Sequence, residues 1–285
     1  MVLMSGGVDS SVAAAVLLEQ GHAVTGVTLR LWGGATNSGC CSVGDVEDAR
    51  RVAAQLGIPH YVFNFSDSFE AEVVDPYVRG YEQASTPNPC VACNQTMKFD
   101  RALHRALALG YDAIATGHHA RVERDPDGRF VLRRGADWAK DQSYVLYMLG
   151  QAQLARTLLP VGEITKADVR AEAARLGLRT AAKAESMDVC FIERGGRRRF
   201  LDERTSARPG PVVDAAGHVV ARHDGITGFT IGQRRGLGLA ATSRRYVVAL
   251  DASTATVTVG DRSALLCDDI GIRDLRYVDG HPASG

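Results

Sequence analysis

The stretch Ser5–Ser11, with the sequence Ser-Gly-Gly-Val-Asp-Ser-Ser, decides the fold. It follows a short apolar run over residues 1–4 that is typical of the end of a buried strand. It leads into a helical pattern over Val8–Gln20, which Gly21 ends. Glycines let backbone N–H groups approach an anion closely, and serine hydroxyls and a helix start add donors and a positive dipole. The stretch therefore predicts a phosphate-binding loop between a strand and a helix.

The spacing of the glycines separates this loop from two commoner nucleotide-binding loops. It contains neither the Gly-Lys-Ser/Thr of the kinase type nor the Gly-x-Gly-x-x-Gly of dinucleotide folds. A lone Gly-Gly turn would equally fit a plain strand-to-helix turn with serine as its N-cap. The complete string is more specific. It resembles the pyrophosphate loop of ATP-pyrophosphatase enzymes, which adenylate an oxygen and then let a nucleophile displace AMP.

Strand and helix patterns alternate after the loop. We expect strands over residues 23–32, 60–65 and 112–116, and helices over 45–56, 66–84 (interrupted near Pro76) and 94–109. This alternation predicts an α/β fold with a parallel sheet covered by helices on both faces. Arg121–Glu123 and Phe130–Arg133 flank an Asp-Pro-Asp-Gly turn and predict a β-hairpin.

The pattern changes after Cys190. Pro209-Gly210-Pro211 interrupts the chain, and short β-type runs follow at 212–213, 218–221, 246–250 and 255–259. We place a boundary near residue 206. The prediction is a Rossmann-like, adenine-nucleotide-binding catalytic domain over 1–205 and a small β-rich module over 206–285.

The composition is that of an ordinary globular protein. The chain has 285 residues, 45% hydrophobic and 23% charged. It contains no apolar run of about 18 residues that could span a membrane. The N-terminus lacks the basic and apolar regions of a secretory signal. We therefore expect a cytoplasmic protein that does not act at a membrane.

The charge is unevenly distributed although the net charge is zero. Residues 1–100 carry 11 acidic and 5 basic side chains, whereas residues 194–245 carry 11 arginines, no lysine and 4 acids. Such a basic segment can follow the phosphates of a nucleic acid. A general preference for arginine explains the identity of the basic residues, because the chain has only four lysines. It does not explain their local excess.

Two of the six cysteines stand in informative contexts. Cys93 closes a Cys-x-x-Cys that starts at Cys90, and we expect it at the N-terminus of a helix capped by Asn94, where a thiolate is favoured. Cys190 follows about a hundred residues later. Two such thiols beside an ATP loop suggest sulfur chemistry.

Metal binding is a weaker interpretation of the cysteines and histidines. A zinc site at the Cys-x-x-Cys needs two more ligands, and the sequence has no second Cys-x-x-Cys. We expect the adjacent pair Cys40-Cys41, like Cys267, to be structural or incidental. His118-His119 is a poor metal pair, because neighbouring residues of a strand point to opposite faces.

Taken together, the motifs resemble those of the bacterial tRNA-specific 2-thiouridylases, in the same order and over the whole chain. Besides the loop, they are Thr86-Pro-Asn-Pro-x-x-x-Cys-Asn94, Ala115-Thr-Gly-His118, Lys140-Asp-Gln-Ser-Tyr144, Met187-Asp-Val-Cys-Phe-Ile192 and Thr230-Ile-Gly-Gln-Arg-Arg-Gly-Leu-Gly238.

The resemblance implies a role for each group of residues. Cys93 would be the nucleophile, and Cys190 would carry a persulfide. The implied ATP-binding residues are Leu3, Met4, Ser5, Gly6, Gly7, Val8, Asp9 and Ser10, with Leu29 and Gly117 near the adenine or ribose. The implied tRNA-binding residues are Asn88, Pro89 and Cys90 at the target base, and His118, Lys140, Asp141 and Gln142 elsewhere on the tRNA.

The implied reaction uses ATP with Mg²⁺ and a tRNA with a wobble uridine. ATP would adenylate the C2 oxygen of the uridine, which is otherwise a poor leaving group. The persulfide sulfur on Cys190 would replace that oxygen as AMP leaves, since persulfides are strong nucleophiles at neutral pH. Attack by Cys93 would leave a Cys93–Cys190 disulfide. A persulfide donor or sulfur-relay protein would reload Cys190, and the target base would be flipped out of its stack.

The sequence departs from the family pattern at three places. Family members continue into a C-terminal β-barrel, so we expect this barrel to be truncated here. The first strand is a few residues short. Cys90 stands where many members carry an acid, and Cys90, Cys93 and Cys190 could jointly hold a [4Fe–4S] cluster. We favour the two-cysteine cycle, because its positions match the family more widely than Cys90 does.

Two other functions stay open on the sequence alone. One is an ATP-pyrophosphatase enzyme acting on a small molecule, such as an amidating ligase or an argininosuccinate-type synthase. Such enzymes need neither the cysteine pair nor the arginine-rich second module. The other is an inactive, truncated nucleotide-binding copy, against which the complete motif set argues.

Overall fold

The computed structural model describes residues 1–32, 43–184, 189–192, 195–206, 208–239, 243–272 and 274–280. The Cys40-Cys41 pair, and Met187 and Asp188 of the Cys190 motif, lie outside these residues. The chain divides into two compact units. The first comprises Met1–Val73, Pro89–Glu193 and Arg276–Gly285, and the second comprises Val74–Asn88 and Arg194–Leu275.

The first unit is built on a sheet of five parallel strands. Their spatial order is β3 (His60–Asn64), β2 (Gly26–Arg30), β1 (Val2–Leu3), β4 (Ile114–Ala115) and β7 (Thr157–Leu158). The predicted parallel sheet is confirmed. Strand β7 was not predicted, because two residues are too few to show an alternating pattern.

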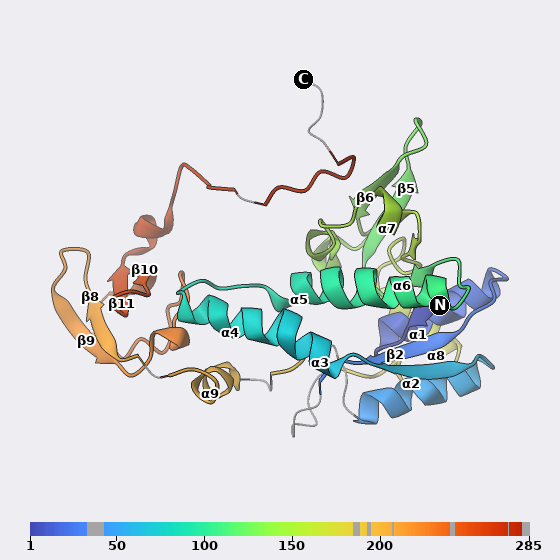
Figure 1. The fold of residues 1–285 in the computed structure, drawn as a ribbon, viewed down its shortest axis with the longest axis horizontal. Coiled ribbons are helices and arrows are strands. Elements are labelled where there is room, and N and C mark those ends of the chain that lie inside the picture. Colours follow the sequence, from blue (N-terminus) through green and yellow to red (C-terminus); the bar gives the residue numbers. More distant parts are fainter. Residues whose placement is uncertain are drawn as a thin grey trace. The chain divides into compact units, whose positions relative to one another are not determined.

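Three helices cover one face of this sheet: α1 (Val8–Glu19), α2 (Val43–Gln55) and α8 (Lys166–Arg175) (Figure 1). Val12, Val52 and Val169 contribute one fully buried side chain from each helix. They pack in one hydrophobic cluster with Val2 and Met4, which lie on the same side of the first strand. Burial of this cluster fixes α1, and with it the loop that precedes α1, at the centre of the sheet.

A long helix covers the opposite face. It consists of α5 (Pro89–Ala92), the π-helical segment η2 (Cys93–Ala102) and α6 (Leu103–Ala108), which follow one another without a break (Figure 1). The Arg105 guanidinium lies 4.5 Å from the centre of the Phe63 ring on β3. The short helix α3 (Ser66–Phe69) also contacts η2.

The start of this long helix differs from the prediction. We expected a helix over 94–109 with Asn94 as its cap and Cys93 at its N-terminus, but the helix begins at Pro89. Proline suits a first helical turn, since its ring sets the backbone angle and its missing N–H has no partner there. Cys90 therefore lies in the first turn. Asn94 does not cap the helix, and its Nδ2 donates to the Val145 carbonyl at 3.0 Å.

The helix predicted over 66–84 is confirmed over residues 66–82, and the interruption expected near Pro76 is a change of helix type rather than a break. A π-helical segment, η1 (Glu70–Val74), separates α3 from α4 (Asp75–Glu82), and Pro76 lies in the first turn of α4. The predicted hairpin is also confirmed: β5 (Ala120–Arg124) pairs antiparallel with β6 (Phe130–Arg134). Short elements follow it at η3 (Trp138–Lys140), η4 (Ser143–Val145) and α7 (Gln151–Leu154).

The second unit holds α4, α9 (Arg197–Asp202) and a four-stranded sheet. The strand order is β10 (Tyr246–Asp251), β11 (Thr256–Gly260), β8 (Gly210–Val213) and β9 (Val219–His223). Strands β11 and β8 run parallel, and the other pairs are antiparallel. Val212, Val247 and Val257 form its fully buried core, with η5 (Ile226–Gly228) packed against them. The prediction of a small β-rich module is confirmed, and its described strands form an open sheet rather than a closed barrel.

Candidate active site

The predicted phosphate loop follows β1 directly, at the carboxyl end of the central strand. Gly6 has a φ of +73°, in the left-handed region that favours glycine, and an added Cβ would collide with the Asp45 carbonyl. Gly7 is the N-cap of α1. Since glycine has no side chain to cap the helix, the first N–H groups of α1 are available to an anion.

The loop serines bond within the loop. Ser10 Oγ accepts from the Ser5 N–H at 3.1 Å and donates to the Gly7 carbonyl at 3.2 Å. Ser11 Oγ donates to the same carbonyl at 2.8 Å. These hydrogen bonds stabilise the shape of the loop, and the role of the hydroxyls as donors to a bound anion stays a prediction. The backbone amides are thereby fixed in position before any ligand binds.

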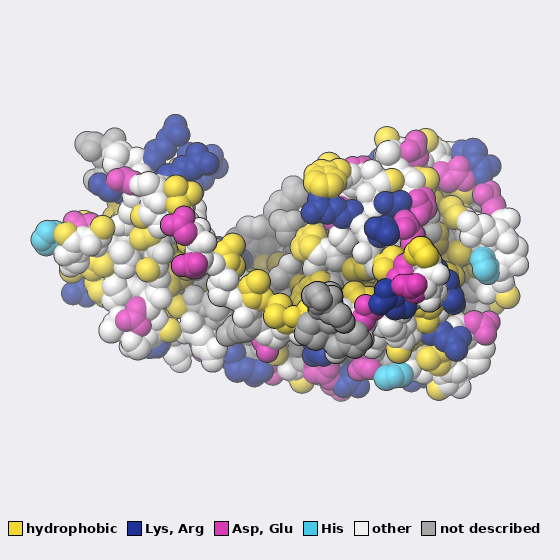
Figure 2. Space-filling view, turned by 90° about the horizontal axis from the view of Figure 1, so that it is seen from above, with side chains coloured by type: hydrophobic (Ala, Val, Ile, Leu, Met, Phe, Trp, Pro, Cys, Tyr) yellow, Lys and Arg dark blue, Asp and Glu magenta, His cyan; other side chains and the backbone are white. Residues whose placement is uncertain are grey.

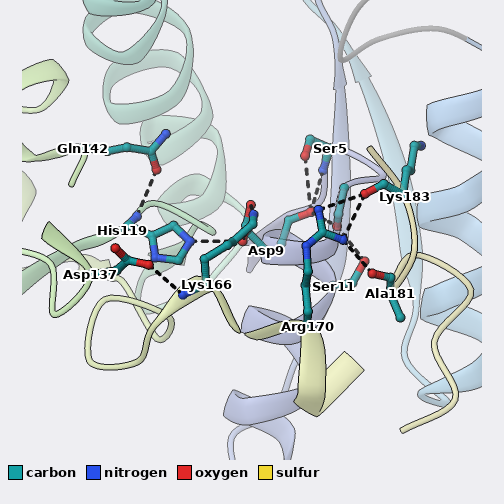
Figure 3. Close-up of polar contacts among 12 residues, drawn as sticks. Ser5, Asp9, Ser11, His119, Asp137, Gln142, Lys166, Arg170, Ala181 and Lys183 are labelled. Atoms are coloured by element: carbon teal, nitrogen blue, oxygen red, sulfur yellow. Dashed lines mark hydrogen bonds and ion pairs between the residues drawn. The ribbon is translucent and has the colours of Figure 1, made fainter. Parts of the chain in front are cut away.

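Asp9, in the first turn of α1, is the centre of an ionic cluster (Figure 3). Lys166 Nζ lies 2.6 Å from each carboxylate oxygen of Asp9, and His119 Nε2 lies 3.1 Å from Oδ1. Burial alone would raise the pKa of Asp9. The hydrogen bonds from His119 and Lys166 outweigh it, so the pKa lies below its usual range. Asp9 is therefore ionised and accepts from both partners, which places a proton on His119 Nε2.

Two further residues hold His119 and Lys166 in place. Gln142 Oε1 accepts from the His119 backbone N–H at 3.0 Å, and the Gln142 N–H donates to the His119 carbonyl at 2.8 Å. Asp137 Oδ2 accepts from the Lys166 backbone N–H at 3.0 Å. This bond is the main reason why the pKa of Asp137 is lowered. The segment from Asp137 to Gln142 is thus connected to Asp9 of the phosphate loop through His119 and Lys166.

Lys183 contacts the loop from its other side (Figure 3). Its Nζ donates to the Gly6 carbonyl at 2.9 Å and to Asp45 and Asp48 at 2.7 Å each. Burial lowers the pKa of Lys183, but the two carboxylates reverse this effect and the pKa is raised overall. Arg170 of α8 donates to the Lys183 carbonyl at 3.2 Å and so positions the segment. Lys183 therefore ties the loop to α2.

The other predicted ATP-binding residues differ in their exposure. Leu3, Met4 and Val8 are buried in the core, and so is Leu29 on β2, opposite Phe63. Gly117 lies against the phosphate loop. An added Cβ there would come within 2.6 Å of the Ser10 nitrogen and 2.7 Å of the Asp9 carbonyl carbon. Glycine at position 117 is thus required for the end of β4 to approach the loop so closely.

The segment that carries Cys190 packs at the end of the second strand. The Phe191 ring lies 5.8 Å from that of Trp32, which follows β2, and 5.5 Å from that of Phe69 on α3. Cys190 itself is half-buried. Since α3 also contacts η2, the element that begins with Cys93, both thiol-bearing segments pack on α3.

Cys93 is buried, with 7% of its surface exposed, and Cys90 is half-buried. The neighbour of Cys93, Asn94, bonds to Val145 of η4. Gln142, three residues before Val145, is bonded to His119, which contacts Asp9. A continuous set of contacts therefore connects the Cys93 helix with the phosphate loop.

The residues predicted to bind tRNA belong to the first unit, except Asn88, which is the last residue of a segment of the second unit. His118 is buried, its Nδ1 lies 2.7 Å from Thr116 Oγ1, and burial lowers its pKa well below the usual value. Asp141 accepts from the Gly135 and Ser143 backbones and turns the chain. Lys140 and Gln142 are half-buried on either side of it. Asn88 and Pro89 lie immediately before and at the start of α5.

A [4Fe–4S] cluster needs three thiolates close together. Across the residues that the structure describes, no group of three or more His, Cys, Asp or Glu side chains could hold a metal ion. Cys90, Cys93 and Cys190 are all among these residues, so their arrangement does not fit a cluster. Mg²⁺ is different, since it is usually held by one or two carboxylates together with substrate phosphates. Asp9 is a carboxylate of the loop itself, and in the folded chain both its oxygens are bonded to Lys166.

Sequence reasoning missed Lys166, Lys183 and His119. The string Thr165-Lys-Ala-Asp168 is a capping box, with Thr165 Oγ1 accepting from the Asp168 N–H at 3.2 Å, and it could have located α8. No local pattern could have shown that Lys166 reaches Asp9. His118 and His119 lie in the loop between β4 and β5 rather than on a strand, so the strand alternation expected from the sequence does not apply to them. His119 nevertheless contacts Asp9, whereas the His118 ring lies 6.0 Å from that of Phe99.

The sheet order, with a glycine-containing anion loop at the carboxyl end of its central strand, defines an ATP-pyrophosphatase-type nucleotide-binding domain, a fold that implies ATP binding. Two known families match the chain, one over each of its two parts. The family described as "tRNA methyl transferase HUP domain" matches residues 1–194, and "tRNA methyl transferase PRC-barrel domain" matches residues 198–261.

Comparison with curated proteins is more specific. The tRNA-specific 2-thiouridylase of Moorella thermoacetica is 51% identical to the chain, covering 98% of it and 80% of the relative. That of Mycolicibacterium gilvum is 53% identical, covering 92% of the chain and 74% of the relative. The chain belongs to the tRNA-specific 2-thiouridylase family.

Solved structures are more distant. The U34-tRNA thiolase NcsA from Methanococcus maripaludis, solved with its [4Fe–4S] cluster, is 18% identical with a TM-score of 0.41, covering 71% of the chain and 62% of that structure. A similarity at this level does not bear on the function of the chain. No helix in the described ranges is long and apolar enough to cross a membrane.

Proposed function

We propose that the chain is an ATP-dependent tRNA-uridine 2-sulfurtransferase that makes 2-thiouridine at the wobble position. The observation that carries this proposal is the 51% and 53% identity, over nearly the whole chain, with relatives named tRNA-specific 2-thiouridylase. The geometry supports it, because both thiol-bearing segments are connected by packing and hydrogen bonds to the elements around the phosphate loop.

The phosphate loop would bind ATP as a substrate. The uncapped amides of α1 face the place where the pyrophosphate would lie, and the ammonium of Lys166 offsets the negative charge of Asp9 there. Asp9 would hold the Mg²⁺, which would supply positive charge to the phosphates. The C2 oxygen of the uridine attacks the α-phosphorus, pyrophosphate leaves, and the oxygen becomes part of an AMP leaving group.

The two thiols would carry the sulfur. The terminal sulfur of a persulfide on Cys190 attacks C2 of the activated uridine, and AMP leaves. The Cys93 thiolate then attacks the Cys190 sulfur, so the persulfide S–S bond breaks and a Cys93–Cys190 S–S bond forms. The bonding electrons remain with the sulfur on the base. A two-electron thiol reductant restores both cysteines, and a persulfide donor reloads Cys190.

This cycle is preferred to a [4Fe–4S] mechanism. The described residues contain no three-ligand group that includes Cys90, and the two-cysteine cycle gives Cys90 no covalent task. Replacement of Cys90 by serine distinguishes the two mechanisms. Activity should fall only slightly in the disulfide cycle, whereas loss of a third ligand would abolish a cluster and any activity that follows the iron content.

The tRNA would contact both units. In the second unit, Arg234, Arg244 and Arg245 line an open hollow. Figure 2 shows Lys and Arg side chains gathered at one end of the part that carries β8–β11. In the first unit, the implied contacts are His118 and Lys140–Gln142. The target base would meet Pro89 and Cys90 of the first unit and Asn88 of the second. We assign catalysis to residues 1–205 and additional RNA contacts to 206–285, and we expect the protein to act where tRNA is modified, in the cytoplasm.

The proposal is tested by mass spectrometry of nucleosides from tRNA, in cells with and without the gene. 2-Thiouridine should disappear with the gene and return when it is restored. An ATP-pyrophosphatase that amidates a small molecule would leave the nucleosides unchanged. Such an enzyme would also release AMP in the presence of its small substrate without any tRNA.

A further inference from the structure

Trp138 is an exposed aromatic side chain that neither the ATP site nor the thiols explain. Its residue is 74% exposed, at the start of η3. The Arg134 guanidinium, at the end of β6, lies 4.0 Å from the centre of its ring system. Single exposed apolar residues are common on protein surfaces. A tryptophan stacked with an arginine is less ordinary, because the pair presents a flat aromatic surface beside a fixed positive charge.

The turn that carries Trp138 is firmly held. The preceding residue, Asp137, accepts from the Ala139 N–H at 3.1 Å and from the Lys166 N–H at 3.0 Å. The Gly135 N–H donates to Asp141 Oδ1 at 3.0 Å. The exposure of the indole is therefore a property of a fixed turn, and a partner that stacks on it meets a preorganised surface.

The position of the turn relates Trp138 to the chemistry. Lys166, which bonds to Asp137 through its backbone, contacts Asp9 of the phosphate loop through its side chain. Trp138 is therefore the neighbour of Asp137, which bonds to Lys166, and Lys166 in turn contacts the phosphate loop. Tyr144, 63% exposed on the following element η4, adds a second aromatic side chain to the same segment.

We infer that Trp138, stacked with Arg134, is a platform for an unpaired base of the tRNA close to the target uridine. Aromatic side chains recognise single-stranded nucleic acids by stacking, and arginines add charge and cation–π interactions. A nucleobase offers the flat π-face, and its phosphate the negative charge, that this pair would complement. The inference rests on the proposed function, and it adds a base-stacking contact to the implied tRNA contacts.

The test uses the two tryptophans of the chain, Trp32 and Trp138. In a Trp32→Phe variant, Trp138 is the sole source of indole fluorescence. Titration with an unmodified tRNA transcript should quench that emission, because a stacked base is in direct contact with the ring. In the otherwise unsubstituted chain, Trp138→Ala should weaken tRNA binding about 5- to 150-fold, the range that loss of one stacked base produces.

Three variants provide the controls. Trp138→Phe keeps a ring and should lose less affinity than Trp138→Ala, and Arg134→Gln should weaken binding and reduce its salt dependence. Tyr61→Ala removes another exposed aromatic side chain, 57% exposed on β3, and should bind tRNA like the unsubstituted chain. ATP binding measured for each variant monitors the fold of the first unit.

The inference is overturned if Trp138→Ala binds tRNA normally and tRNA leaves the Trp138 emission unchanged. It is also overturned if the emission responds to a persulfide-carrying donor protein but not to tRNA, since the surface would then be a protein-docking site. Formation of 2-thiouridine by the unsubstituted chain is measured in the same samples. If the unsubstituted chain forms 2-thiouridine and either of these two results is found, only the base-stacking role of Trp138 is refuted. If the unsubstituted chain forms no 2-thiouridine, the proposed function is refuted.

Discussion

Lys166 Nζ lies 2.6 Å from both carboxylate oxygens of Asp9, although the two residues are 157 positions apart in the chain. Asp9 lies in the first turn of α1, within the phosphate loop, and Lys166 begins α8, which packs beside α1. Two helix N-termini are therefore brought together by one ion pair. Within the phosphate loop, the ammonium of Lys166 thus offsets the negative charge of the Asp9 carboxylate.

Replacement of Lys166 by methionine should weaken ATP binding about 10- to 100-fold, the effect of losing a hydrogen bond to a charged group. The reason is that Asp9 would then face the phosphates without its counter-charge. Isothermal titration with a non-hydrolysable ATP analogue measures the change. Arg175→Met is the matched control, because Arg175, at the other end of α8, pairs near the surface with Glu172 of α8 and Glu19 of α1 rather than with Asp9. Normal affinity in Lys166→Met would contradict the role given to the pair.

Gly117→Ala should disrupt the ATP site without altering any charge. The new Cβ would come within 2.6 Å of the Ser10 nitrogen, so either β4 or the loop must move. Overpacking of this kind typically costs about 1–3 kcal/mol of stability. We expect reduced ATP affinity and a lower melting temperature. Gly271→Ala, where a Cβ has no neighbour within 4 Å, should change neither property.

Stability should depend on pH through His118. Burial lowers its pKa well below 6.5, so the unfolded chain binds a proton that the folded protein does not. The free energy of unfolding should therefore fall as the pH drops below about 6.5, by up to about 1.4 kcal/mol per pH unit from this group. His118→Gln should flatten this dependence in urea unfolding between pH 6.5 and 5.

Binding of tRNA should weaken with salt. Each phosphate contact that is lost lowers the slope of log affinity against log salt by about one. Replacing Arg234 and Arg235 by glutamine should therefore reduce the slope by about two. Arg50 and Arg51, which pair with Glu47 on the surface of α2, are the matched control pair and should leave the slope unchanged. An unchanged slope in Arg234→Gln/Arg235→Gln would exclude these side chains as phosphate contacts.

The fold could be predicted where local chemistry decides it. The Gly-Gly loop, the alternation of strands and helices and the turn-rich second module each have local patterns, and the structure confirms the elements they predict. The helix containing Cys93 begins earlier than predicted, because Pro89 suits a first helical turn as well as it suits a loop. Strand β7 has only two residues, which are too few to show the alternation of apolar and polar side chains typical of a strand.

Of the candidate site, only the phosphate loop could be predicted from the sequence. Ser5–Ser11 can be recognised in the sequence, because the loop chemistry is local. Lys166, Lys183 and His119 reach the loop only through tertiary packing, over separations that no local pattern encodes. The hydrogen bonds of Ser10 and Ser11 to the Gly7 carbonyl were likewise not predicted, because they depend on the shape of the folded loop.

The central claim is that Cys93 and Cys190 together deliver sulfur to an adenylated uridine. It is tested most directly by supplying purified protein with ATP, unmodified tRNA transcript and a persulfide donor, and measuring 2-thiouridine by mass spectrometry. The unsubstituted chain should form it, whereas Cys93→Ser and Cys190→Ser should form none. The Cys93→Ser protein should retain a persulfide on Cys190. Formation of 2-thiouridine by either variant at the rate of the unsubstituted chain would contradict the account.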